Sequence, residues 1–376
     1  MSIYYIIFWS LVFFSFLEQF TNIRRGFKKY IVFLYSCLFV LMSTVYIGML
    51  GDYHEYENFF YYVSLKDLRY VFNGWFEFLY TLVNLIVKIY VNNYVVLRFV
   101  LAVFVMSVWF EIYVSGMSSI IQNNSVFIML IVWTLNFGNV FIARSTISIA
   151  LCLYSMRYVE KKEFRNYFLC TAAAFGFHTM SICWIIVYPL FHKIKHQVIY
   201  LFSLLSMVFV MLFYDKIPGM LAIVARYSPP RIQRSLYVYI NSGIENMFGM
   251  QYSMRFTILK GMANIFLMIA LFSYLNFRYK KRADIEGVCF EKYFNVYLAG
   301  TAIYAVSMSV SIGLSRAAIP FTLTSAFLIP HIFNLPEMRR KIAFRFVVFV
   351  FLIMYLYLRF YLNIGNGTDD FNTIFQ

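Results

Sequence analysis

Charged residues are scarce in this chain of 376 residues. Asp, Glu, Lys and Arg make up 13% of it, whereas 62% of the residues are hydrophobic and 22% are aromatic. A soluble protein carries roughly twice this charged fraction. Because so few polar groups cannot cover the surface of a soluble protein of this length, an ordinary soluble domain is excluded. Apolar stretches recur from residue 4 to residue 362, which indicates one integral membrane domain over residues 1–376.

The patterns that would hold a disulfide, a nucleotide or a metal are also missing from the sequence. The five cysteines contain no CxxC pair, and four of them lie inside apolar stretches, so no disulfide framework is expected. Neither GxGxxG nor GxxxxGK[ST] occurs, which leaves a nucleotide without its usual binding loop. The segment HEYEN lacks the second histidine of HExxH, and the pair His192 and His196 lies in a basic loop. We therefore expect no metal and no other cofactor.

Apolar stretches long enough to cross a bilayer are abundant. A transmembrane helix needs about 20 apolar residues, and ten stretches are clear candidates. They lie at about 4–20, 31–50, 94–113, 125–140, 144–158, 198–214, 253–276, 290–312, 317–334 and 343–362. Two further stretches, 75–91 and 166–190, are harder to place. The sequence therefore predicts an all-α polytopic membrane protein with about 10–12 transmembrane helices.

Lysine and arginine predict how the chain is oriented. The formal charge of +15 is not gathered in one patch, as nucleic-acid binding would require, but lies in five clusters between apolar stretches. Basic clusters favour the cytoplasmic side, so all five are placed there. They are Arg24, Arg25, Lys28 and Lys29; Arg157, Lys161, Lys162 and Arg165; Lys193 and Lys195; Arg278, Lys280, Lys281 and Arg282; and Arg339, Arg340, Lys341 and Arg345. The loops 51–73 and 215–252 then lie outside the cytoplasm.

This orientation constrains the two doubtful stretches. Residues 166–190 must enter the membrane and return, with a break near residues 176–178, if both flanking clusters are cytoplasmic. The stretch 75–91, which carries Glu77, Asn84 and Lys88, must be a short re-entrant or interfacial helix. Non-helical backbone at membrane depth is tolerated only beside protein or a water-filled cavity, so a cavity on the outer side is expected. Alternatively, the number of crossings would agree with the placement of the basic clusters if a span near 114–140 had been miscounted.

Four charged or titratable residues fall at the outer ends of apolar segments or at the break in one: Asp52, Arg144, His178 and Arg316. Such residues in a membrane mark function by default. The arginine fork suits phosphate oxygens, although an arginine at a helix end can also simply reach the interface. Histidine suits proton transfer near neutral pH, although isolated histidines on apolar helices are more often packed core groups.

Two outer loops carry further candidate binding residues. Residues 51–62 read GDYHEYENFFYY, where Tyr53 and Tyr56 lie among carboxylates as sugar binding requires; an aromatic belt at the membrane interface is the alternative. The 215–252 loop and its end are rich in arginine, which favours an anionic ligand or, alternatively, contact with anionic lipid headgroups. The arginines concerned are Arg226, Arg231, Arg234 and Arg255.

Taken in order along residues 1–360, these segments resemble the Wzy-type polysaccharide polymerases, in particular the EpsG-like family. The loop GDYHEYENFF is followed by GWFEFLYTLVN with Glu77, which is similar to the glutamate-containing aromatic helix of that family. NVFIARSTISIALCLYSMRYVEKKEF supplies Arg144, AAFGFHTMSICWIIVYPLF supplies His178, and GLSRAAIPF matches the late arginine, Arg316. The chain departs from the pattern at Ser145, where the family usually has glutamine after the arginine.

The resemblance implies a fold similar to the C-type glycosyltransferases and a site facing the periplasm from the bacterial inner membrane. The implied reaction transfers a growing glycan from undecaprenyl pyrophosphate onto the non-reducing end of a new lipid-linked repeat unit, without metal or nucleotide. Arg144 and Arg316 would stabilise the pyrophosphate, and His178 would be the base, with Asp52 as its competitor. The remaining substrate-binding residues would be Tyr53, Tyr56, Glu77, Arg226, Arg231, Arg234 and Arg255. Expected partners are the lipid-linked repeat units, membrane lipids and a chain-length regulator protein, but no nucleic acid.

Two other classes of function remain open at this point. A transporter that moves oligosaccharide-lipids across the membrane would also need cations in a cavity. Transporters often consist of two similar halves, and no internal repeat is visible in this sequence. A membrane scaffold without chemistry is the second alternative, which the intramembrane Arg, His and Asp residues disfavour.

Overall fold

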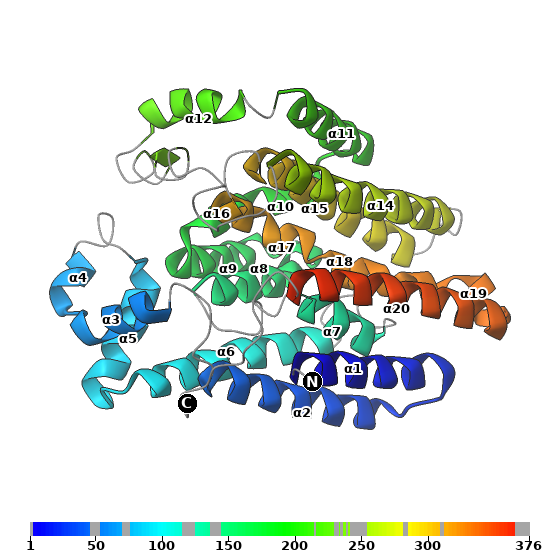
Figure 1. Ribbon diagram of the computed structural model, residues 1–376, viewed down its shortest axis with the longest axis horizontal. Helices are drawn as coiled ribbons and strands as arrows, with labels where there is room; N and C mark the ends of the chain where they lie inside the picture. The colour runs from blue at the N-terminus through cyan, green and yellow to red at the C-terminus, as the bar shows by residue number, and fades with distance from the viewer. Residues whose placement is uncertain are drawn as a thin grey trace. The chain divides into compact units, whose positions relative to one another are not determined.

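The computed structural model describes residues 3–45, 53–69, 76–114, 125–135, 144–213, 216–228, 254–280, 285–308 and 312–364, with residues 233, 236–237 and 240. This part of the chain contains helices and no strand (Figure 1). Seven of its helices are long and apolar enough to cross a membrane. The protein is therefore an all-α polytopic membrane protein, as predicted. The larger count of 10–12 spans includes shorter segments and stays a prediction.

Contacts along the chain divide it into two compact units. The first unit contains Met1–Thr179 and Ala326–Gln376, and the second contains Met180–Ser325. Each is described by itself below.

The first unit is a bundle of antiparallel helices joined by aromatic side chains. Its long helices are α1 (Ile3–Phe20), α2 (Arg25–Val45), α6 (Tyr94–Val114), α8 (Arg144–Glu160), α9 (Phe164–Phe177) and α20 (Ile342–Ile364). Its shorter ones are α3 (Tyr53–Tyr62), α4 (Leu65–Arg69), α5 (Phe78–Tyr90), α7 (Val126–Thr134), the 3-10 helix η4 (Ile329–Asn334) and α19 (Pro336–Arg340). Helix α8 packs on α9, α2 on α6 and α1 on α7 (Figure 1). The rings of Phe8 and Phe360 stack with centroids 4.5 Å apart and join α1 to α20.

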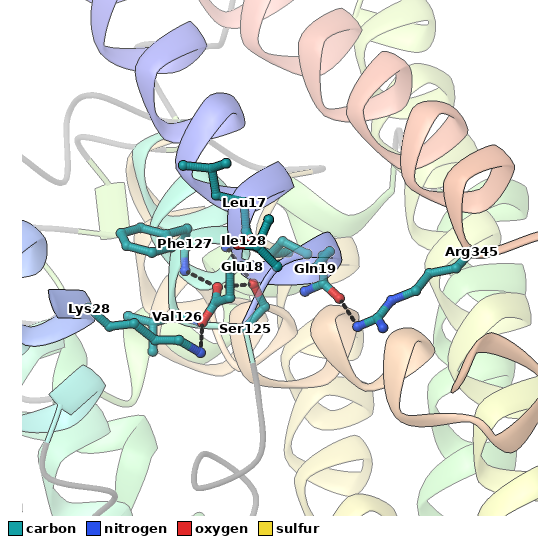
Figure 2. A network of polar contacts seen from close by, with 10 residues as sticks. Leu17, Glu18, Gln19, Lys28, Ser125, Val126, Phe127, Ile128 and Arg345 are labelled. Atoms are coloured by element: carbon teal, nitrogen blue, oxygen red, sulfur yellow. Dashed lines mark hydrogen bonds and ion pairs between the residues drawn. The ribbon is translucent and has the colours of Figure 1, made fainter. Parts of the chain in front are cut away.

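A buried carboxylate ties three helix ends together at one end of this unit (Figure 2). The carboxylate of Glu18, on α1, pairs with Lys28 Nζ of α2 at 2.8 Å. It also accepts hydrogen bonds from the Ser125 hydroxyl and from backbone N–H groups in the first turn of α7, so it caps a helix other than its own. Next to it, Arg345 Nη2 of α20 donates to Gln19 Oε1 at 2.6 Å. The basic clusters around residues 24–29 and 339–345 therefore lie at the same end, as the predicted orientation requires.

The start of α8 lies at the opposite end of the first unit. Helix α6 runs antiparallel to α2, because its early residue Arg98 donates to the carbonyl oxygen of Ser43, near the end of α2. At the other end of α6, Glu111 lies 3.9 Å from Arg157, close to the end of α8. Since α8 is a continuous helix, its first residue, Arg144, lies far from the basic clusters. That this end faces outward remains a prediction.

The two stretches that were hard to place, 75–91 and 166–190, are short or broken. The predicted orientation of the basic clusters requires this. Helix α5 has 13 residues, which span about 20 Å at 1.5 Å per residue, well short of a hydrocarbon core of about 30 Å. Helix α9 ends at Phe177, and His178 is extended, with φ −155° and ψ 120°. A 3-10 helix, η2 (Thr179–Ile186), and α10 (Val187–His192) follow. The predicted break is therefore found at His178; the return of this segment to the cytoplasmic side remains a prediction.

The second unit is arranged around one buried helix, α15 (Ile285–Met308), which packs against α10, α11, α14 and α17. Its other helices are α11 (His196–Phe213), α12 (Ile217–Arg226), α14 (Met254–Lys280), α16 (Ile312–Ser315), the 3-10 helix η3 (Arg316–Ala318) and α17 (Ile319–Thr322), and α18 (Ser325–Leu328) leads back to the first unit. Gly300 lets α17 approach α15 closely, because a Cβ there would lie 2.4 Å from Phe321 Cβ. The stretch predicted as a span at 317–334 consists of consecutive short helical segments, and Arg316–Asn334 is one of the seven candidate spans.

Candidate functional site

A buried glutamate forms the centre of the candidate site. Glu77 is 6% exposed and lies immediately before α5, with an extended backbone and a side chain that does not cap its own helix. Its carbonyl oxygen instead accepts from Thr81 N at 2.9 Å, which starts the helix. The carboxylate therefore makes no capping hydrogen bond to α5 and instead contacts residues that are distant in the sequence.

One of these residues is Arg144, the first residue of α8. Its Nη1 donates to Glu77 Oε2 at 2.6 Å. The guanidinium carbon lies 4.7 Å from the centroid of the Phe76 ring and 5.9 Å from that of Tyr56. Its Nε is buried and makes no hydrogen bond to the described part of the chain. Arg144 is thus held by a carboxylate and two rings, and its side chain keeps 23% of its surface exposed.

The break after α9 brings two more groups to the same carboxylate. Nδ1 of His178 lies 3.6 Å from Glu77 Oε1, within ion-pair range but longer than a hydrogen bond. Thr179 donates to the same oxygen from its backbone N at 3.0 Å and from its hydroxyl at 2.6 Å. The extended conformation of His178 ends α9 and lets both residues face Glu77. The sequence predicts this break, but it does not predict that the residues at the break contact Glu77.

These contacts keep Glu77 charged. Burial alone would raise the pKa of its carboxyl, but the contacts with His178 and Arg144 outweigh burial and hold the pKa well below its ordinary value. The carboxylate is therefore ionised at neutral pH. It can orient an imidazole and stabilise a positive charge on it, and it neutralises Arg144 until another anion binds.

A face of tyrosines from α3 covers the site. Tyr53, Tyr56 and Phe60 are buried, at positions i, i+3 and i+7 of the helix. Tyr56 packs on Phe76 and Tyr80, with ring centroids 5.6 and 5.8 Å apart. Tyr53 packs on Tyr94 at 5.6 Å. The two tyrosines predicted to bind sugar therefore lie beside the charged residues; that they bind sugar stays a prediction.

The other predicted site residues are not brought into this cluster by the described contacts. Asp52, Arg231 and Arg234 lie outside the described residues, and of Arg255 only its place in α14 is described. Arg226, at the end of α12, and Arg316, in η3, are exposed and belong to the second unit. The roles proposed for these residues stay predictions.

Three residues at the site were not predicted from the sequence: Phe76, Thr179 and Arg98. Phe76 directly precedes Glu77 in the sequence, and Thr179 directly follows His178. Both could have been found by including the sequence neighbours of the two predicted residues. Arg98 is 7% exposed, and its guanidinium carbon lies 5.1 Å from the Tyr53 ring centroid. The signal for Arg98 was a lone arginine inside the apolar stretch 94–113, which was counted only as a span.

No group of three or more His, Cys, Asp or Glu side chains among the described residues could hold a metal ion. The cluster itself offers a carboxylate, an imidazole, a guanidinium and hydroxyl groups. These can move a proton and bind an anion.

Comparison with known protein families assigns the chain to one of them. A family model described as the EpsG family matches residues 28–371. The chain belongs to the EpsG family. The matched region contains Glu77, Arg144 and His178, so the cluster lies within the part of the chain that defines membership. No curated protein and no solved structure matches the chain. Membership of the EpsG family indicates a membrane protein of polysaccharide metabolism and is consistent with a glycosyltransferase-like polymerase.

Proposed function

We propose that this EpsG-family protein is a polysaccharide polymerase that acts on lipid-diphosphate-linked repeat units at the cluster of Glu77, Arg144 and His178. The observation that supports this most is the convergence of a histidine and an arginine, from two separate segments, on one buried carboxylate of a third segment. The product is O-antigen, capsule or exopolysaccharide. The site faces away from the cytoplasm in the bacterial inner membrane, opposite the basic clusters.

The reaction needs one proton acceptor and one stabiliser of the leaving group. A hydroxyl oxygen at the non-reducing end of the acceptor attacks the anomeric carbon of the donor, whose bond to the diphosphate oxygen breaks with inversion. The hydroxyl proton passes to His178. The electron pair stays on the lipid diphosphate, and Arg144 stabilises the charge that develops there, as fixed cations do in a water-poor site. The step needs no metal and no nucleotide.

Glu77 acts through its two neighbours. Its oxygen Oε1 faces Nδ1 of His178, which directs the other ring nitrogen, Nε2, toward the acceptor and stabilises the imidazolium formed by proton transfer. Its oxygen Oε2 holds Arg144 through Nη1, which leaves the buried Nε of that arginine for a phosphate oxygen. Asp52 remains the competing base, and Arg316 remains a second candidate for the leaving group.

Replacement of His178 tests the base directly. The His178→Ala protein is expected to be made and inserted at near wild-type level but to form little polymer, because proton transfer contributes about 10²–10⁴-fold to such reactions. Membrane abundance by immunoblot and polymer length by gel are measured together. If abundance and polymer fall in parallel, His178 is a packed core residue. Retained synthesis by His178→Ala with loss in Asp52→Asn would transfer the role to Asp52.

A glycine allows the close approach of α9 and α5, the helices next to His178 and Glu77. Gly176 of α9 faces α5, and a Cβ there would lie 2.7 Å from Leu79 Cγ. Gly176→Ala should push α5 away from α9 and displace Glu77 from His178. It should also lower the free energy of unfolding by about 1–3 kcal/mol. Misplacement of this kind can cost roughly 10²-fold in rate.

The chain provides a matched control and a rescue for this glycine. A Cβ at Gly26 meets nothing within 4 Å, so Gly26→Ala should leave melting temperature and polymer yield unchanged. Adding Leu79→Ala to Gly176→Ala makes room for the methyl group and should restore part of the yield. Wild-type melting and yield in Gly176→Ala alone would show that the close approach has no role.

A further inference from the structure

Arg98 is a buried cation whose charge no carboxylate pairs with in the described part of the chain. It lies on the candidate membrane span α6 and is 7% exposed. Its Nη2 donates to the carbonyl oxygen of Ser43. Its Nη1 is buried and makes no hydrogen bond to the described residues. Glu57 is close enough to interact electrostatically with Arg98 but is not among its salt-bridge partners.

Such an arrangement is costly unless an anion binds there. Desolvating a guanidinium in a protein interior is unfavourable, and an apolar residue of similar volume often serves packing better. A carbonyl oxygen and an aromatic face offset only part of this cost, because neither carries a full negative charge. An arginine in this position within a membrane helix is therefore a sign of function, and its unused N–H donor indicates where a ligand oxygen would bind.

Arg98 and Arg144 flank consecutive turns of one helix. Arg98 stacks on Tyr53 at 5.1 Å and Arg144 on Tyr56 at 5.9 Å. These tyrosines are three residues apart on the buried face of α3, a rise of about 4.5 Å. The two arginines come from α6 and α8, which pack against each other. Two guanidiniums with unused buried donors thus lie beside the buried face of the same short helix.

We propose that Arg98 is a second anion-binding residue of this site, and that Arg98 and Arg144 each bind one phosphate of a lipid diphosphate. This inference rests on the proposed function and names the part of the substrate that the two arginines recognise. Nη1 of Arg98 donates to one phosphate, and Nε of Arg144 donates to the other. Because Arg98 and Tyr53 are 7% and 9% exposed, the Tyr53 ring moves aside when the diphosphate enters. Tyr53 and Tyr56 hold the guanidinium planes in place before binding.

Comparison of two short lipids tests this directly. Full-length protein in nanodiscs is titrated with farnesyl diphosphate and with farnesyl monophosphate, and the Kd of each is measured. The wild type should bind the diphosphate about tenfold to a hundredfold more tightly, as expected when one more phosphate is held by a charge-assisted contact. Arg98→Met should lose this preference while its affinity for the monophosphate is unchanged. Arg98→Lys keeps the charge and the stem, and it carries the test if Arg98→Met does not fold.

A matched control lies at the other end of α8. Arg157 also stacks on two tyrosines, Tyr154 and Tyr158, at 5.0 and 5.3 Å, but lies far from Arg144. Arg157→Met should keep the wild-type preference for the diphosphate.

The outcomes separate this inference from the proposed function. If both Arg98 variants keep the wild-type preference for the diphosphate, Arg98 serves packing and the inference is wrong, while polymerisation by the same variants leaves the proposed function intact. If the wild type does not distinguish the two lipids, two-phosphate recognition is wrong. Polymer synthesis by the wild type from a lipid-linked repeat unit then decides the proposed function independently.

Discussion

Replacing Glu77 with glutamine is expected to abolish polymer formation almost completely. Glutamine has nearly the same shape and can still accept hydrogen bonds from Thr179, but it removes the negative charge that faces His178 and Arg144. An amide in place of a carboxylate that orients a catalytic histidine costs about 10⁴-fold in a serine protease. A loss of about 10³–10⁴-fold is expected here, measured as the initial rate of chain growth per folded protein.

The same substitution should also lower stability, because Arg144 loses its ionic partner. Removing one partner of a buried ion pair costs about 3–5 kcal/mol; the cost here should fall below this range because the Arg144 side chain is 23% exposed. Loss of activity must therefore be separated from loss of fold.

Glu18 provides the control for that separation. It is also a buried carboxylate with an ionic partner, since it pairs with Lys28 at 2.8 Å and its side chain is 2% exposed. It lies beside the start of α2 (Figure 2), whereas Glu77 contacts Arg144 at the opposite end of the first unit. Glu18→Gln should lower the melting temperature by a similar amount while the rate per folded protein stays at the wild-type value. Equal losses of rate in the two variants would mean that Glu77 serves the fold and not the reaction.

Replacing Arg144 with lysine is expected to remove most polymerisation without loss of insertion. Lysine keeps the charge and the length of the side chain, so it would serve equally well if the arginine only reached the membrane interface. It lacks the planar fork that binds two phosphate oxygens or a carboxylate and a phosphate together. By analogy with oxyanion donors, the loss should be about 10²–10³-fold. Polymer length is compared at matched expression.

Arg316 gives the same test at a second, independent position. It begins η3 in the second unit and is exposed. If it takes part in binding the leaving group, Arg316→Lys should also lose most chain growth. Arg359, which stacks on Tyr355 at 5.9 Å, is the control, and Arg359→Lys should be silent. Full chain growth by both Arg144→Lys and Arg316→Lys would leave these arginines as membrane anchors.

Hydropathy and charge predicted much of the fold, because the constraints that a membrane imposes are local. Lone arginines and histidines in apolar stretches identified Arg144 and His178. The cytoplasmic placement of the basic clusters required that 166–190 and 75–91 not cross the membrane fully, which predicted the break near His178 and a short helix at 75–91. These features depend on segment length and on the cost of burying charge, which can be read from a few neighbouring residues.

The pairing of these residues could not be predicted in the same way. Glu77 meets Arg144 across 67 positions and Thr179 across 102, and the sequence does not indicate which of several acids lies beside which cation. Asp52 was predicted as a competing base and Glu77 as a substrate-binding residue, and the packing of α5 on α9 brings Glu77 to His178. Arg98 was missed because the surrounding residues satisfy the pattern of a span so well that its charge did not alter the assignment.

The most direct test of this account is synthesis by the purified protein. Wild type and Glu77→Gln are incubated with one synthetic lipid-diphosphate-linked repeat unit in the presence of a chelator and without nucleotide, and the products are separated by length. The account predicts a ladder of polymers from the wild type and only the starting repeat unit from Glu77→Gln. Movement of the lipid across a vesicle without chain growth, or an equal ladder from Glu77→Gln, would contradict it.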